Sequence, residues 1–309
     1  MTQPPYPPHQ QEALPGCWWH PNRQTGLRCV RCNRPACPDC LRDAPVGYQC
    51  VDCVHAGARE SRVRRPAFRG SRTVAGAPVS TRAVVTPLLI AVNVLVYLVT
   101  AAQAGEMMQN QRSEVFFDGM LWPLRVVVTD EWWRLLTSGF LHYGLLHLAM
   151  NMLALWILGR DLEVLLGKIR FLALYLVSLL GGSTAVFVFG DLTSAVAGAS
   201  GAVYGLMGAL LVAVLRLKLN PSSAIGIIVL NLVLTVTIPG ISLLGHLGGL
   251  IIGALAMVAM VYAPAKQRTA YQVGTLVFLT LAMVGLIVYR DGAAVAEACA
   301  IPGVCLGVA

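Results

Sequence analysis

Charged residues are scarce in this chain. Asp, Glu, Lys and Arg together make up 12% of its 309 residues, whereas hydrophobic residues make up 56%. Soluble domains carry about 25% charged residues. The shortage of charge therefore excludes an ordinary soluble globular protein and predicts an integral membrane protein.

The start of the sequence lacks the apolar segment of a secretory signal peptide, because MTQPPYPPHQQEALPG is rich in Pro and Gln. We therefore expect the amino terminus to stay in the cytoplasm. Residues 1–16 have little to pack and are predicted to form a disordered tail. The net charge of +8 comes largely from arginines ahead of the first apolar run, which suits an anionic membrane surface better than a nucleic acid.

Metal-ligating side chains follow in four regular pairs with the pattern CxxH-x8-CxxC-x4-CxxC-x9-CxxC. Their members are Cys17, His20, Cys29, Cys32, Cys37, Cys40, Cys50 and Cys53. Each two-residue gap presents two ligands to one metal, so the eight side chains can hold two tetrahedral Zn²⁺ ions. Regular pairing in a reducing compartment argues against disulfides.

Residues 17–55 are therefore predicted to be a small zinc-binding module. Its core is too small to fold unaided, so the two zinc ions would be structural and would supply folding energy. The module resembles B-box and related cross-braced zinc modules, although its spacing matches no single one closely. Whether the pairs bind in sequence order or cross-brace stays open, and a cytosolic protein partner is compatible with such a module.

Residues 56–82 carry seven arginines among Gly, Ser and Ala. This composition predicts a flexible basic linker whose charge acts as a topology signal. Nucleic-acid binding is the alternative reading of such a segment. Phe68 is the only aromatic residue there that could stack on a base, which argues against that alternative.

Seven apolar segments follow, each near the ~20 residues that span a bilayer. They lie at about 84–103, 142–159, 169–190, 199–216, 223–239, 243–263 and 270–289. Basic residues gather in alternate connections on the linker side, so the positive-inside rule places the amino terminus in the cytoplasm and the carboxyl terminus outside. Residues 291–309 would then be an extracytoplasmic tail, where a disulfide between Cys299 and Cys305 could persist.

Three of these segments carry polar residues that this topology brings to a similar depth near the outer face. Ser200 opens one segment in GASGAVY, His246 lies in GHLGGLIIG, and His147 and Asn151 share a helix face in HLAMN. A neutral imidazole can take the proton of a serine hydroxyl. His147, Asn151 and the Ser200 backbone N–H could then donate to a developing oxyanion.

The outer half of each predicted span lacks a carboxylate, and a buried acid would be costly there. This inventory favours a Ser-His dyad over a triad. Glycines at 201, 205 and 208 and at 245, 249 and 253 would let two helices approach closely. Serine beside glycine in a membrane helix commonly serves packing alone, so it is the conjunction of the motifs that points to catalysis.

Together with Trp133-Arg134, the motifs GASGAVYG, GHLGG and HLAMN resemble the rhomboid family of intramembrane serine proteases over residues 83–290. The resemblance implies an all-α polytopic membrane protein with a six-helix core, here followed by a carboxyl-terminal transmembrane helix and preceded by the zinc module. It implies a loop lying partly in the membrane around Trp133-Arg134. One departure is the glycine that precedes the histidine in GHLGG, where alanine is common.

The resemblance also assigns roles to the motif residues. It implies a nucleophile, a general base, two oxyanion donors, two glycines of the GxSG box and an aromatic that packs on the base: respectively Ser200, His246, His147 with Asn151, Gly198 with Gly201, and Tyr204. The expected function is an intramembrane serine endopeptidase that needs no catalytic cofactor. It would cleave single-span membrane proteins near the outer face of the lipid bilayer.

A non-enzymatic adaptor is the main alternative. Such a rhomboid-like protein would bind membrane clients while the zinc module recruits a cytosolic partner. The chain keeps both dyad residues, which favours the enzyme. A transporter is the weaker third reading, because the spans lack the buried carboxylate or lysine that ion coupling usually needs.

Overall fold

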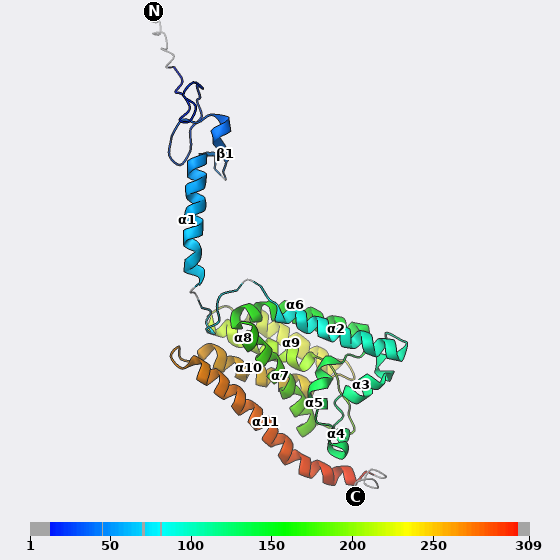
Figure 1. The fold of residues 1–309 in the computed structure, drawn as a ribbon. Coiled ribbons are helices and arrows are strands. Elements are labelled where there is room, and N and C mark those ends of the chain that lie inside the picture. Colours follow the sequence, from blue (N-terminus) through cyan, green and yellow to red (C-terminus); the bar gives the residue numbers. More distant parts are fainter. Residues whose placement is uncertain (1–12, 45, 70–71, 81, 302–309) are drawn as a thin grey trace, which may run out of the picture. The chain divides into compact units, whose positions relative to one another are not determined.

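The computed structural model describes residues 13–44, 46–69, 72–80 and 82–301, with side chains described outside 61–69. The chain divides into two compact units, Met1–Ser71 and Arg72–Ala309. Helices dominate the second unit, and the described residues hold one small two-stranded sheet, which lies in the first unit (Figure 1). The prediction of a helical membrane protein with a small preceding domain is confirmed.

The first unit is built around its cysteines. It contains the 3-10 helix η1 (Pro38–Cys40), strands β1 (Leu41–Asp43) and β2 (Tyr48–Cys50), and helix α1 (Val51–Arg69). The strands pair antiparallel with Leu41 opposite Cys50. Its buried core consists of Cys17, Cys29, Ala36, Cys37, Cys40, Leu41 and Cys50. So few apolar side chains cannot offset the entropy of ordering the segment, so a further source of folding energy is required.

Two predicted boundaries of this unit are wrong. The linker predicted to be flexible from residue 56 begins as a helix, because α1 runs on to Arg69. Asp52 in its first turn favours the helix N-terminus, and the Ala, Arg and Glu residues that follow are strong helix formers. The ordered module also starts before residue 17, since Gly16 pairs with Gln24. The rest of the predicted tail, residues 1–12, lies outside the described residues.

Seven helices in the second unit correspond to the seven predicted apolar segments. They are α2 (Val85–Ala104), α6 (Gly144–Leu166), α7 (Lys168–Phe189), α8 (Ser200–Arg216), α9 (Ser222–Thr237), α10 (Leu243–Tyr262) and α11 (Arg268–Cys299). Within the described residues, four are long and apolar enough to cross a membrane, and α6 joins them when counted with the bent segment Arg134–Phe140. Helices α8 and α9 are shorter, at 17 and 16 residues.

The last helix is longer than predicted. Helix α11 has 32 residues and continues to Cys299, into the segment 291–309 that the sequence places in a tail. That extension is rich in alanine, the strongest helix former. An ion pair of 2.6 Å between Arg290 and Glu297 also bridges it. The proposed partner of Cys299, Cys305, lies outside the described residues, so their disulfide stays a prediction.

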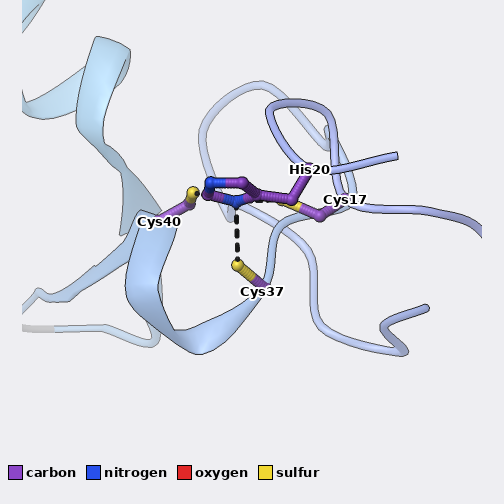
Figure 2. Close-up of side chains that lie close together, drawn as sticks. All are labelled: Cys17, His20, Cys37 and Cys40. Atoms are coloured by element: carbon purple, nitrogen blue, oxygen red, sulfur yellow. Dashed lines mark hydrogen bonds between the residues drawn. The ribbon is translucent and has the colours of Figure 1, made fainter. Parts of the chain in front are cut away.

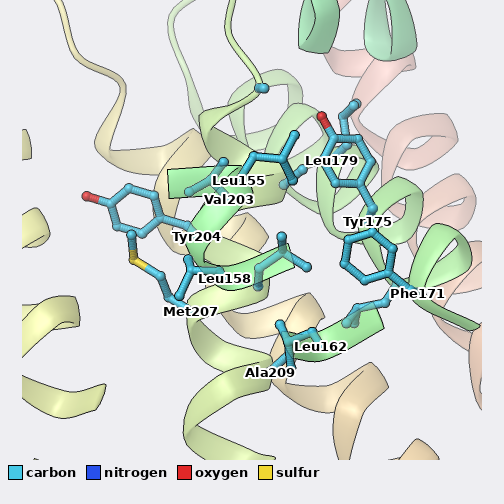
Figure 3. Packing of buried hydrophobic residues seen from close by; sticks show 14 of the residues in the cluster. Leu155, Leu158, Leu162, Phe171, Tyr175, Leu179, Val203, Tyr204, Met207 and Ala209 are labelled. Atoms are coloured by element: carbon cyan, nitrogen blue, oxygen red, sulfur yellow. The ribbon is translucent and has the colours of Figure 1, made fainter. Parts of the chain in front are cut away.

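Helix α8 occupies the centre of the second unit. Its residues 202–209 are all buried, as expected of a helix that is apolar on every side. Figure 3 shows this packing, with Leu155 of α6, Tyr175 of α7 and Met207 of α8 among the contributing side chains. The predicted close approach of α8 and α10 is confirmed, since an ideal Cβ on Gly253 would lie 2.3 Å from the Gly205 carbonyl oxygen.

The connection between α2 and α6 folds into short helices around a buried arginine. These are η2 (Asn110–Arg112), α3 (Glu114–Gly119), α4 (Pro123–Thr129), α5 (Arg134–Thr137) and η3 (Ser138–Phe140). The Arg134 side chain is fully buried. Its Nη1 donates to the carbonyl oxygens of Phe117 (2.6 Å) and Met120 (2.9 Å), and it also pairs with Glu131. Arg134 therefore links α5 to the end of α3, while the neighbouring Trp133 is exposed.

A buried carboxylate near the end of α6 binds the amino-terminal turn of α2. Glu163, near the end of α6, accepts hydrogen bonds from the backbone N–H groups of Val84, Val85 and Thr86 at 2.6–2.8 Å, and from the Thr86 hydroxyl at 2.9 Å. These donors form the amino-terminal turn of α2, whose partial positive charge favours an anion. Glu163 thereby satisfies donors that would otherwise stay unpaired.

Candidate functional site

The serine and histidine motifs meet where α8 and α10 begin. Ser200 is the first residue of α8, and His246 is the fourth residue of α10. His246 Nε2 and Ser200 Oγ lie 2.8 Å apart, and the imidazole is 6% exposed. This distance satisfies the geometric condition for a nucleophile next to its base.

The Tyr204 ring packs against the ring of His246. Its ring stacks on the His246 imidazole with 3.9 Å between centroids and 16° between planes. Tyr204 lies one helical turn after Ser200, so both side chains project from the same face of α8 toward α10. The stacking that the sequence predicts is therefore present.

Gly198 lets a second histidine, His147, approach the serine loop, the name we give to Gly198 and Ala199, the two residues before Ser200. Its φ is +143°, a region that side chains rarely adopt, and an ideal Cβ there would lie 2.8 Å from His147 Cε1 and 3.6 Å from Ser200 Oγ. Its N–H donates to the Ser138 carbonyl oxygen at 2.9 Å, which anchors the loop. The His147 ring therefore lies directly beside the residues that precede Ser200. Glycine is required at 198 because of its φ and because a side chain there would clash with His147.

The hydrogen bonds of His147 indicate which nitrogen carries its proton. The Tyr143 N–H donates to His147 Nδ1 at 3.3 Å. A neutral imidazole that accepts at Nδ1 must be protonated at Nε2. An ideal Cβ on Gly198 would lie 3.0 Å from that Nε2, so the protonated edge faces the serine loop. This is the orientation an oxyanion donor needs.

Asn151 is hydrogen-bonded within its own helix, α6. It is buried at 7% exposure, and its Nδ2 donates to the His147 carbonyl oxygen one turn earlier in α6 at 3.0 Å. This bond holds the amide against its own helix, on the same face as His147. Its predicted role as an oxyanion donor stays a prediction.

Sequence reasoning missed two residues of the site. Thr235 of α9 lies with its Oγ1 2.7 Å from His246 Nδ1 and 2.6 Å from the Tyr204 hydroxyl. His142 accepts from the Ala199 N–H at its Nε2 (3.4 Å) and meets the His147 ring edge to face. Neither residue belongs to a spaced motif. A single threonine or histidine in an apolar segment does not indicate a functional site, because the sequence does not tell which way its helix faces.

The cysteine pairs form two clusters in the first unit. One contains Cys17, His20, Cys37 and Cys40, and the other contains Cys29, Cys32, Cys50 and Cys53, with the ligand atoms of each cluster within 4.8 Å of one another. The first pair therefore joins the third, and the second joins the fourth. The structure thus answers the open question of pairing: the arrangement is cross-braced.

The geometry of the first cluster fits a tetrahedral metal. Figure 2 shows the His20 ring among the three sulfur atoms, with Nδ1 3.4 Å from Cys40, 3.5 Å from Cys37 and 3.9 Å from Cys17. Ligands about 2.1–2.3 Å from one tetrahedral Zn²⁺ lie about 3.5–3.8 Å apart. These residues can therefore hold zinc without rearrangement.

The thiols of this cluster differ in acidity. Burial raises the pKa of Cys17, but backbone hydrogen bonds from Cys37 and Trp19 outweigh it and lower the pKa to about 6. Burial and the neighbouring Cys37 thiol raise the pKa of Cys40 to about 12. Several thiolates this close repel one another, and a bound cation would relieve that repulsion.

Comparison with known proteins gives consistent matches over the helical unit. Residues 129–263 match the rhomboid domain family. The chain is 39% identical over 180 residues to the rhomboid protease GluP of Bacillus subtilis, covering 57% of this chain and 34% of that protein. It is 36% identical over 148 residues to RHOMBOID-like protein 4 of Arabidopsis thaliana, covering 45% of this chain and 37% of that protein.

A third relative is matched over most of its length. The rhomboid protease AarA of Providencia stuartii is 26% identical over 232 residues, covering 66% of this chain and 82% of that protein. The chain thus spans about a third of the length of the first two relatives. The matched family segment includes Ser200, His246, His147 and Asn151, and it ends before α11.

Proposed function

We propose that this chain, whose residues 129–263 match the rhomboid domain family, is an intramembrane serine endopeptidase. Ser200 is the nucleophile and His246 the general base. The observation that carries the proposal is the 2.8 Å contact between Ser200 Oγ and His246 Nε2, made by residues 46 positions apart in the sequence. The rhomboid proteases among the relatives support it.

The reaction proceeds in two steps. Ser200 Oγ attacks the carbonyl carbon of the scissile peptide as its proton passes to His246 Nε2, and that proton then leaves with the departing amine as the C–N bond breaks. Water hydrolyses the resulting ester, with His246 again taking and returning a proton. The His147 Nε2–H, Asn151 and the Ser200 backbone N–H stabilise the oxyanion in both steps. Neutral imidazole supplies the base, so the chemistry needs no cofactor.

The substrate is a single-span membrane protein cut near the outer membrane face. The amino terminus is cytoplasmic and the carboxyl terminus extracytoplasmic, according to the distribution of basic residues. Ser200, His246 and His147 all lie in the first turns of their helices, at the end opposite Glu163 and Arg216. The scissile peptide of the substrate must unwind from its helical conformation before attack. Substrates with Gly, Pro or small residues near the outer membrane face are therefore preferred.

The first unit is a structural zinc module that binds two Zn²⁺ ions. The cross-braced clusters and the small apolar core support this role. A cytosolic protein is the partner we propose for it, because the distribution of basic residues places the amino terminus in the cytoplasm.

Co-reconstitution in liposomes tests the function. The full chain is combined with a single-span reporter that carries a Gly-Pro segment near its outer boundary, and the fragments are identified by mass spectrometry. Cleavage at that boundary by the wild type and its loss in Ser200→Ala is the expected result. Equal cleavage by both proteins would contradict the assignment of Ser200.

A further inference from the structure

The side of His246 that faces away from Ser200 contacts a threonine hydroxyl. Thr235 Oγ1 lies 2.7 Å from His246 Nδ1, 2.6 Å from the Tyr204 hydroxyl and 2.9 Å from the Asn231 carbonyl oxygen. Thr235 is 4% exposed. One buried oxygen atom thus contacts three polar groups from α8, α9 and α10.

Counting protons fixes the direction of these hydrogen bonds. The Asn231 carbonyl can only accept, so the single Thr235 hydroxyl proton goes to it. The two lone pairs of Thr235 Oγ1 then accept from the Tyr204 hydroxyl and from His246 Nδ1. His246 therefore carries its proton on Nδ1, which leaves Nε2 unprotonated and directed at Ser200 Oγ.

We propose that Thr235 is a positioning residue that holds His246 in its Nδ1–H tautomer. In a Ser-His-Asp triad a buried carboxylate does this. Here a hydroxyl whose own proton is committed to Asn231 does it without placing a charge among apolar helices, where an ionised group is costly. The effect on catalysis rests on the proposed function, whereas the tautomer does not.

Helix α9 provides a matched control. Thr237 makes the same backward hydrogen bond as Thr235, from Oγ1 to the carbonyl oxygen four residues earlier, here Val233 at 2.8 Å. Its side chain is exposed, whereas that of Thr235 is buried. Thr237→Val removes a helix back-bond alone. Thr235→Val removes the back-bond and the contacts to His246 and to the Tyr204 hydroxyl at nearly constant volume, and Thr235→Ser restores the hydroxyl.

The tautomer is measured directly by nitrogen NMR of histidine-labelled full chain in lipid nanodiscs, with the His246 signals identified by their loss in His246→Ala. The expected result is a protonated Nδ1 and an unprotonated Nε2 in wild type, Thr235→Ser and Thr237→Val. Thr235→Val should populate the other tautomer. A protonated Nε2 in the wild type, or an unchanged tautomer in Thr235→Val, would overturn the proposal.

The rate of labelling by a fluorophosphonate is the second readout. We expect Thr235→Val to react about tenfold or more slowly, because one hydrogen bond to the base is lost, with Thr235→Ser within about threefold and Thr237→Val unchanged. Thermal unfolding shows that each variant is folded. A wild type that never reacts contradicts the protease assignment, and the NMR result still decides the tautomer. If the wild type reacts and Thr235→Val reacts at the same rate, the positioning role is contradicted.

Discussion

Gly249 of α10 lies against the backbone of Gly201 of α8. An ideal Cβ placed on Gly249 would come within 1.9 Å of the Gly201 carbonyl oxygen, so a side chain cannot fit at this contact. Gly201 follows Ser200 directly, and Gly249 lies three residues after His246. The separation of the serine and the histidine is thus set by the closest approach of the two helices.

A methyl group at this contact should separate the two helices. We expect Gly249→Ala to destabilise the protein by about 1–3 kcal/mol, as overpacking commonly does, and to lower fluorophosphonate labelling of Ser200 more than tenfold. Gly274→Ala in α11 is the control, because an ideal Cβ there would have no atom within 4 Å apart from its own helix backbone and chain neighbours. If Ser200 in Gly249→Ala is labelled at the wild-type rate, the separation of the helices does not control the site.

Gly198→Ala should inactivate the site by displacing His147. The new methyl group would lie 2.8 Å from the His147 ring, and the φ of +143° adds backbone strain. We expect a fall in turnover that is larger than the loss of stability, measured as the melting temperature, can explain. Gly105→Ala at φ +67° has open space around it and tests strain without the clash. If both variants keep full activity, the contact with His147 is irrelevant to catalysis.

The cross-braced clusters predict two zinc ions per chain, countable by elemental mass spectrometry of the purified full chain. Cys37→Ser should lose one ion and leave the other cluster filled. His55→Ala is the control, since this exposed histidine lies in α1 outside both clusters. Removing zinc with a chelator should unfold the first unit and leave the helical unit intact. A zinc content unaffected by Cys37→Ser would contradict the assignment.

The ion pairs at Glu131 predict an acid-sensitive connection. Burial raises the pKa of Glu131, but Arg125 and Arg134 outweigh burial and hold the pKa below its ordinary value of 4.5. Because the folded pKa is depressed, this stabilisation is complete above the ordinary value and is lost as the pH falls through the folded value. Thermal unfolding of the full chain between about pH 6 and about pH 3 should therefore show an acid decline.

Glu131→Gln should flatten that decline and lower stability at neutral pH, because Arg134 stays buried without its counter-charge. Glu114→Gln in α3, an exposed position, provides the control. An acid decline of the same size in wild type and Glu131→Gln would show that this carboxylate does not govern it.

The sequence alone predicts the helices and the meeting of Ser200 with His246, because both leave local patterns; the catalytic role of the pair stays a prediction. Apolar runs of spanning length mark the helices, and Ser200 and His246 each lie in a glycine-rich motif at a helix start. The pairing of the cysteines could not be predicted, since four regular pairs allow either arrangement. The extent of α1 past residue 56 was hidden by its basic composition, which is typical of a linker as well as of an exposed helix.

Thr235 and Glu163 show what a sequence pattern cannot supply. Thr235 and Thr237 lie two residues apart in one apolar helix, and the rotation of α9 alone decides which of them meets His246. The partners of Glu163 lie 77 to 79 residues earlier in the chain. Contacts of this kind depend on how whole helices pack, so they can be identified only from the three-dimensional structure.

The most direct measurement is the site of covalent modification by a fluorophosphonate. Purified full chain in detergent and in lipid is treated with the probe, and the adduct is mapped by mass spectrometry in wild type, Ser200→Ala and His246→Ala. The account predicts an adduct on Ser200 in the wild type and none in either variant. A folded wild type that stays unmodified in both environments, or an adduct that persists in Ser200→Ala, would contradict it.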